Sequence, residues 1–140
     1  MKKIFLSTGF LFATLFAMAQ DTWKIKLNNK TLLSTGTEDE SANHRSIAVA
    51  EWAKKGNLEV CYKETPAKKE WSRSIFFVDE NDNELIRKDN VTHAKVSIEA
   101  LKKAFAGKSK IRIFTTSTPT DPDLAARVRI RRVHLYTLDL

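Results

Sequence analysis

Short runs in which apolar and polar residues alternate recur along the chain, and they predict a protein built mainly from β-strands. In the first run, Trp23, Ile25 and Leu27 alternate with polar residues, which places the three apolar side chains on one face of a strand. The Asn28-Asn29 pair that follows is typical of a turn, so a hairpin is expected. Residues 72–78 contain an apolar run of β-branched and aromatic residues, which predicts a buried strand. Altogether, strands are expected over residues 22–27, 30–34, 45–49, 58–63, 72–78, 84–87, 110–116 and 127–138.

One clear helix is expected, over about residues 97–106. The Ser97 hydroxyl is suited to cap the free N–H groups at its start, and Gly107 ends it. Shorter helical turns are expected over residues 50–55 and from Asp121-Pro122, where an acidic cap precedes a proline at the first helical position. Many short strands with one helix and small helical connections indicate a mainly antiparallel β-sandwich.

The last predicted strand, over residues 127–138, contains a break in its alternation. Val128 and Ile130 share one face, whereas Val133 and Leu135 share the other. A β-bulge near Arg131-Arg132 restores the alternation. The alternative is that both faces of this strand are partly covered.

An order of elements also occurs twice: strand, helical turn, strand, proline loop, strand. The two copies begin at His44 and His93, and in each the helical stretch ends at a glycine, Gly56 or Gly107. A duplication would give two similar half-sheets packed face to face. Because few residues are identical, chance similarity is the alternative.

The N-terminal residues have the pattern of a secretory signal peptide. Lys2 and Lys3 precede an uncharged apolar run that ends in Ala17-Met18-Ala19, so cleavage is predicted after Ala19. The run is shorter than the ~20 residues of a membrane-spanning helix, although an uncleaved N-terminal anchor is the alternative. We therefore expect a periplasmic or secreted protein with a signal peptide over residues 1–19 and a single β-sandwich domain over residues 20–140.

Composition narrows the possible classes of protein. Among 140 residues there are 24 Lys and Arg, 17 Asp and Glu, and one cysteine, which gives a net charge of +7. This excludes a disulfide scaffold and a cysteine-rich zinc module. The one cysteine, Cys61, lies in a predicted strand; a half-buried strand residue is the simpler interpretation, and a reactive thiol is the alternative.

The sequence lacks the motifs of common catalytic sites. It has no G-x-S-x-G motif and no glycine-rich phosphate loop, so no catalytic residue and no cofactor is predicted. His44 and His93 are weak candidates for metal ligands, because they become equivalent only if the duplication is real. Residues 79–84 resemble the start of a calcium loop but lack its glycine, so a hairpin turn is the preferred interpretation.

The remaining chemistry is that of a basic binding surface. Trp71 and Arg73 combine an aromatic ring with a cation, and Arg129 and Arg131 alternate along the last predicted strand. These four residues are the predicted ligand-binding residues of a small exported binding domain. An anionic polysaccharide or another cell-envelope component is the favoured partner, and export makes nucleic acid unlikely. A solvated strand face whose arginines pair with nearby acids is the simpler interpretation of the arginine run.

A different class of protein remains an alternative to the binding domain. It is a small exported enzyme or enzyme inhibitor, with a site built from loops around His44, His93 and Asp121, and with assistance from a metal ion as one option.

Overall fold

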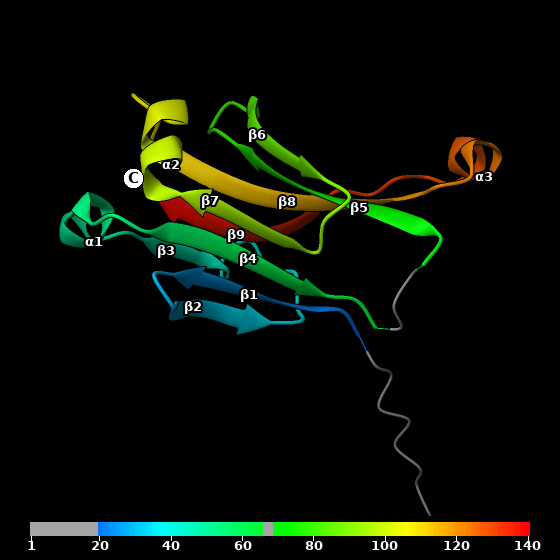
Figure 1. The fold of residues 1–140 in the computed structure, drawn as a ribbon, viewed down its shortest axis with the longest axis horizontal. Coiled ribbons are helices and arrows are strands. Elements are labelled where there is room, and N and C mark those ends of the chain that lie inside the picture. The colour runs from blue at the N-terminus through cyan, green and yellow to red at the C-terminus, as the bar shows by residue number, and fades with distance from the viewer. Residues whose placement is uncertain (1–19, 66–68) are drawn as a thin grey trace, which may run out of the picture.

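The chain forms two β-sheets packed face to face, which confirms the predicted β-sandwich (Figure 1). The computed structural model describes residues 20–65 and 69–140; the predicted signal peptide and residues 66–68 lie outside the described residues. The strands are β1 (Thr22–Leu27), β2 (Lys30–Thr35), β3 (His44–Ser46), β4 (Asn57–Lys63), β5 (Trp71–Val78), β6 (Glu84–Asp89), β7 (His93–Ser97), β8 (Lys110–Pro119) and β9 (Val133–Asp139).

The first sheet has the strand order β2-β1-β4-β7, and the second has the order β3-β9-β8-β5-β6. All pairs in the described part of the chain are antiparallel except β3 with β9. The β1–β2 hairpin turns at Asn28 and Asn29, which have φ values of 49° and 69°. Positive φ at both central residues is the geometry that matches the twist of a two-residue hairpin.

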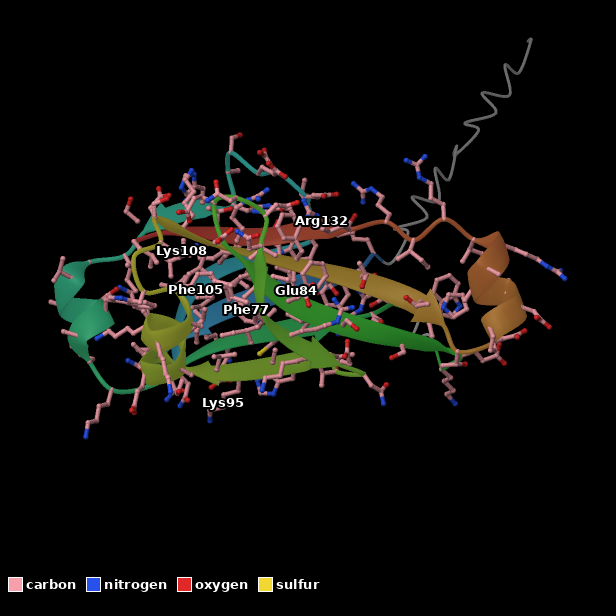
Figure 2. The ribbon with its side chains drawn as sticks, turned by 90° about the horizontal axis from the view of Figure 1, so that it is seen from above. Phe77, Glu84, Lys95, Phe105, Lys108 and Arg132 are labelled. Carbon is pink, nitrogen blue, oxygen red and sulfur yellow. The ribbon has the colours of Figure 1, made fainter. Side chains whose placement is uncertain are left out.

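The core fills the space between the sheets with residues that alternate along the strands. The predicted face of β1 is buried, and Trp23 donates a hydrogen bond across the sandwich from Nε1 to the Leu135 carbonyl oxygen, at 3.0 Å. Figure 2 shows Phe77 and Phe105 within the body of the molecule and Lys95 at its margin. The buried cluster comprises Trp23, Ile25, Leu27, Leu58, Val60, Tyr62, Ile75, Phe77, Ala94, Val96, Ile98, Leu101, Phe105, Ile111, Ile113, Leu135, Tyr136 and Leu138.

The described residues also form the short helices α1 (Val49–Ala53), α2 (Ile98–Ala104) and α3 (Pro122–Arg127). The predicted caps are confirmed: the Ser97 hydroxyl accepts the Ala100 N–H at 3.1 Å, and the Asp121 carboxylate accepts the Asp123 N–H at 3.0 Å. In Figure 1, α1 and α2 lie at one end of the sandwich and α3 lies at the other. No helix among the described residues is long and apolar enough to cross a membrane.

The prediction of a strand over residues 127–138 is wrong in its first half. Arg127 is the last residue of α3, residues 128–132 belong to no strand, and β9 begins at Val133. The Asp121 cap starts a helix that continues through the helix-forming Leu-Ala-Ala segment to Arg127. The irregularity in pairing lies opposite the Ile113–Phe114 step of β8 rather than near Arg131-Arg132. Similarly, the strand predicted over residues 45–49 ends at Ser46, because α1 begins at Val49.

The repeated order of elements is present in part, as β3-α1-β4-β5 and β7-α2-β8-α3-β9, where α3 has no counterpart among the described residues of the first copy. In both copies the helix connects strands of different sheets, since β3 and β8 belong to the second sheet and β4 and β7 to the first. The copies differ at the last step: β4 and β5 lie in different sheets, whereas β8 and β9 are neighbours in the same one.

Candidate functional site

The four predicted ligand-binding residues line one cleft near the α3 end of the sandwich. Trp71 and Arg73 come from β5, and Arg129 and Arg131 come from the segment between α3 and β9. The cleft has a volume of about 220 Å³. We call it the Trp71–arginine cleft, and it is lined by Asp21, Tyr62, Trp71, Arg73, Thr115, Ser117, Arg129, Arg131 and Val133.

The floor of the cleft continues the inner faces of the sheets, where apolar side chains give way to polar ones. On β5, Trp71 and Arg73 share the face of the buried Ile75. On β8, the partner of Arg73 is Ser117 and the partner of Ile75 is Thr115. The interior of the sandwich therefore ends in hydroxyl and charged groups on this side instead of in a closed apolar core.

Arg73 is a buried member of this floor. Its side chain is 5% exposed, and its Nε lies 2.7 Å from Glu64 Oε1. Its Nη1 donates to Thr115 Oγ1 at 3.0 Å, and its guanidinium carbon lies 3.9 Å from the centre of the Tyr62 ring. A buried arginine with carboxylate and hydroxyl partners has little capacity left for a ligand, so Arg73 holds the floor in place.

Tyr62 and Asp21 complete the floor. The Tyr62 hydroxyl donates to Asp21 Oδ2 at 2.8 Å, and Asp21 Oδ1 accepts the Thr65 N–H at 3.0 Å. Burial raises the pKa of Tyr62 far above its ordinary value, so this phenol stays neutral at all physiological pH values. Asp21 lies two residues before Trp23, and Tyr62 lies two residues after Val60, so both share the inner face with a buried neighbour. Our prediction did not include Asp21 and Tyr62 in the site, although this spacing was the signal for them in the sequence.

The accessible cations of the cleft are Arg129 and Arg131, and they differ in their partners. Arg131 pairs with Glu38, whose other oxygen accepts the His134 N–H at 3.0 Å. Burial alone raises the pKa of Glu38, but these hydrogen bonds outweigh it and hold that pKa below its ordinary value. Arg129 is exposed and has no hydrogen-bond or ion-pair partner among residues 20–65 and 69–140.

A wider hollow of about 550 Å³ adjoins the cleft and is lined by Arg129, Ile130, Arg131 and Arg132. Arg132 shares the Asp82 carboxylate with Arg112, at 2.9 and 3.1 Å. One carboxylate thus serves two arginines, and Arg129 has none, so the surface keeps an excess of positive charge. Arg129 and Arg131 line both hollows, so the positively charged surface continues from the cleft into the wider hollow.

A hydroxyl without a partner is also present in the cleft. The Ser117 Oγ is buried and makes no hydrogen bond with the described residues. Unsatisfied buried polar atoms are uncommon in folded proteins. Ser117 is one of the residues that line the cleft, but its unpartnered oxygen lies beneath the surface.

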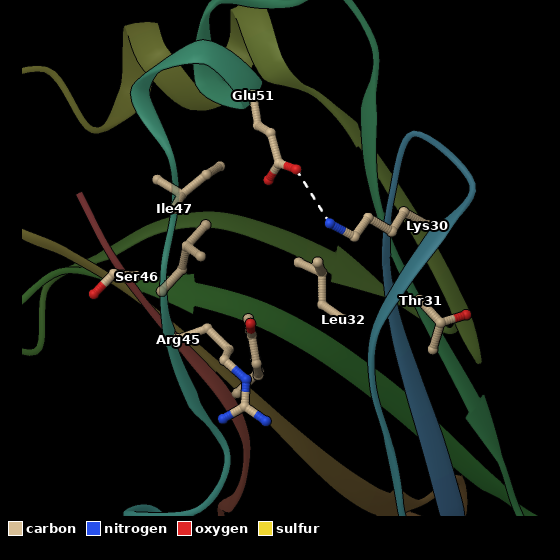
Figure 3. A pocket seen from close by; sticks show the side chains of 9 residues that line it. Lys30, Thr31, Leu32, Arg45, Ser46, Ile47 and Glu51 are labelled. Atoms are coloured by element: carbon tan, nitrogen blue, oxygen red, sulfur yellow. Dashed lines mark hydrogen bonds and ion pairs between the residues drawn. The ribbon is translucent and has the colours of Figure 1, made fainter.

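A separate hollow of about 270 Å³ opens between β2 and β3 (Figure 3). Figure 3 shows Glu51 and Lys30 facing each other at one end of the hollow and Arg45 at the other end. The apolar side chains of Leu32 and Ile47 lie between the Glu51–Lys30 pair and Arg45. The Lys30 Nζ lies 3.3 Å from Glu51 Oε1, so these two charges compensate each other. None of the four predicted ligand-binding residues lines this hollow.

The residues of the alternative loop-built site are not brought together. His44 is on β3, and its Nε2 lies 2.5 Å from Asp139 Oδ2. His93 is on β7 of the other sheet, and its Nε2 lies 3.0 Å from Glu59 Oε2. Asp121 caps α3. Among the described residues, no hydrogen bond or ion pair joins any two of these three side chains.

Comparison with models of protein families, with curated proteins and with solved structures finds no match for the chain.

Proposed function

We propose that the protein is a small exported binding domain whose Trp71–arginine cleft holds an anionic carbohydrate. The observation that carries the proposal is the presence, in one cleft, of the partly exposed Trp71 ring and an arginine, Arg129, with no described partner. The proposal of export rests on the signal-peptide pattern of residues 1–19.

The chemistry of the lining suits an acidic sugar. An indole offers a large apolar face with low conformational entropy, and this face can cover the C–H side of a sugar ring. A guanidinium binds carboxylate or sulfate groups with two parallel hydrogen bonds.

The size of the site suits one unit of a longer polymer. A volume of about 220 Å³ is smaller than the roughly 300–1,000 Å³ of pockets that enclose whole drug-sized ligands. The adjoining hollow lined by Arg129, Ile130, Arg131 and Arg132 extends the basic surface beyond it. A chain of acidic sugars would fill the cleft with one residue and lay its neighbours along the arginines.

Binding is tested by isothermal titration calorimetry of the protein with polygalacturonate, neutral dextran and polyglutamate, a readout that does not depend on Trp71. We expect polygalacturonate to bind most tightly and to lose affinity at high salt, because its charges are screened. Arg129→Ala should lower the affinity about tenfold or more, since a hydrogen bond to a charged group contributes roughly 1.5–3 kcal/mol. Trp71→Ala should lower it by about tenfold as well, because the large apolar face that covers the sugar ring is lost.

Arg127→Ala is the matched control. Arg127 is also exposed and has no ion pair among the described residues, but it lies on α3 and does not line the cleft. Equal binding of polyglutamate and polygalacturonate, or an equal loss with Arg127→Ala and Arg129→Ala, would show only a general attraction to polyanions and would contradict the proposal.

A further inference from the structure

We propose that Glu59, Cys61 and His93 bind a zinc ion on the outer face of the first sheet. These residues are independent of the Trp71–arginine cleft, because none of them lines it. They form the group of possible metal ligands that the described residues bring together. The proposal therefore stands or falls separately from the proposed carbohydrate binding.

The register of β4 with β7 creates the group. Cys61 lies directly opposite His93, and Glu59 lies on the same face of β4, two residues earlier. The neighbouring Tyr62 N–H donates to the Thr92 carbonyl oxygen at 2.7 Å, so the Cys61–His93 pair is of the type without mutual hydrogen bonds. In that type of antiparallel pair the facing side chains are closest.

The donor atoms are already near one another. His93 Nε2 lies 3.0 Å from Glu59 Oε2, and the donor atoms of the three side chains all lie within 4.8 Å of one another. Zinc bonds of about 2.0–2.3 Å in a tetrahedron place donors roughly 3.3–3.8 Å apart. The donor atoms must therefore move by at most about 1 Å to reach this geometry. The His93 side chain is 53% exposed, so it can shift without displacing core residues.

The set of donors matches the chemistry of zinc. Thiolate sulfur, imidazole nitrogen and carboxylate oxygen are the three kinds of zinc ligand in proteins. The thiolate and the carboxylate together balance the two charges of the ion, and three protein ligands leave a fourth position for water. Because the thiol must lose its proton when it binds the ion, binding releases protons and tightens as the pH rises.

Nearby lysines oppose a cation at this face and so sharpen the test. Lys95 Nζ lies 3.9 Å from Glu59 Oε1, and Lys24 and Lys26 of β1 lie opposite Cys61 and Glu59. Their positive charges repel a metal ion bound to Glu59. Removing the charge of Lys95 should therefore strengthen metal binding, whereas removing a ligand should weaken it.

The experiment is a titration of the reduced full-length chain with cobalt(II), followed by displacement with zinc. We expect one equivalent of cobalt to produce a thiolate-to-cobalt charge-transfer band with tetrahedral visible bands, and zinc to abolish them. Cys61→Ser should remove the charge-transfer band. His93→Gln and Glu59→Gln should lower zinc affinity by at least about tenfold. Substitution of residues that only hydrogen-bond to zinc ligands already lowers metal affinity by about 10–100-fold, and loss of a ligand should cost no less.

His44→Gln is the matched control, because His44 also lies beside a carboxylate, Asp139, but on the other sheet. It should leave the affinity unchanged, and Lys95→Gln should raise it. The proposal is overturned if the wild-type chain shows no thiolate band, or if His93→Gln and His44→Gln bind zinc equally well. All five substituted side chains are exposed or partly exposed, so circular dichroism should show that the variants keep their fold.

Discussion

Single buried polar groups stabilise this protein where its turns meet its sheets, and Asp79 is the clearest case. Its carboxylate is fully buried and accepts the N–H groups of Asn81 and Asn83, each at 2.9 Å. Lys108 Nζ lies 2.9 Å away. The acidic residues after β5 thus form a hairpin turn, as predicted. The Asp79 carboxylate accepts hydrogen bonds from the residues of this same turn.

Asp79 should make the stability of the protein sensitive to acid. Hydrogen bonds from the Asn83 side chain and from Lys108 hold the pKa of Asp79 well below its usual range. A lowered folded-state pKa contributes stability above the unfolded value of about 4, and this contribution is lost as the pH falls toward the folded value. Urea unfolding of Asp79→Asn should show lower stability at neutral pH and a flatter loss in acid.

The exposed Asp123 provides the control for this prediction, because it has no comparable set of partners. Asp123→Asn should keep the acid profile of the wild type. An unchanged profile in Asp79→Asn would show that the Asp79 contacts do not contribute as described.

Tyr136 and Tyr62 offer a second test at the scale of one atom. The Tyr136 hydroxyl is buried without a hydrogen-bond partner among the described residues, and burial raises the pKa of Tyr136 to about 12. Tyr136→Phe should therefore be neutral or stabilising by up to about 1 kcal/mol, because it removes an unsatisfied polar group. Tyr62→Phe should destabilise by about 1–2 kcal/mol, because Asp21 loses a donor. Urea unfolding measures both; a large loss in Tyr136→Phe would reveal a partner for its hydroxyl.

At the scale of the elements, the junction between α1 and β4 depends on Gly56. Gly56 has a φ of 153°, and a Cβ at this position would lie 1.5 Å from Asn28 Oδ1. That oxygen accepts the Asn57 N–H at 2.9 Å, so the Asn28 side chain cannot move away without breaking the bond. The β1–β2 turn and the start of β4 are thereby coupled at one glycine.

Gly56→Ala should destabilise the protein by about 2–4 kcal/mol, from backbone strain and the lost Asn28 bond. Gly107→Ala is the matched comparison, since Gly107 has a φ of 74° but open space around its Cβ position. It should cost only about 1–2 kcal/mol, the strain of a left-handed residue. Equal midpoints in thermal or urea unfolding of the two variants would contradict the role of Asn28.

At the scale of the whole molecule, Trp23 connects the two sheets. It is 3% exposed, stacks on Tyr62 with ring centres 6.0 Å apart, and donates its indole N–H to the Leu135 carbonyl oxygen of β9. β9 is irregular at this point, because its pairing with β8 shifts between Ile113 and Phe114. The indole N–H thus satisfies a carbonyl at the place where the ladder is interrupted.

Trp23→Phe should destabilise the protein by about 1–3 kcal/mol. The substitution leaves the Leu135 carbonyl oxygen without its donor and replaces the indole by a smaller ring in the core. Trp52→Phe should cost less, about 1 kcal/mol or below, since Trp52 packs against the edge of the core and stays partly exposed on α1. Guanidinium unfolding followed by far-ultraviolet circular dichroism tests the pair. Similar losses in both variants would argue against a special role for the bond between the sheets.

The sequence by itself determined the features that depend on neighbours in the chain. Alternation identified the buried face of β1, and the caps at Ser97 and Asp121 marked the starts of α2 and α3 correctly. These features follow from the two-residue period of a strand and from the free N–H groups of a helix start. Arg129 and Arg131, by contrast, were selected because they alternate along a predicted strand, and that strand does not include them.

Only the tertiary structure decided what depends on pairing between distant segments. Alternation in residues 127–132 imitated a strand, but no neighbouring strand pairs with this segment, and the segment instead brings Arg129 and Arg131 to Trp71. The contact of Arg73 with Thr115 and the meeting of Cys61 with His93 depend on sheet register in the same way. A strand pattern specifies which side chains share a face, whereas the strand that will lie opposite is chosen by the packing of the complete core.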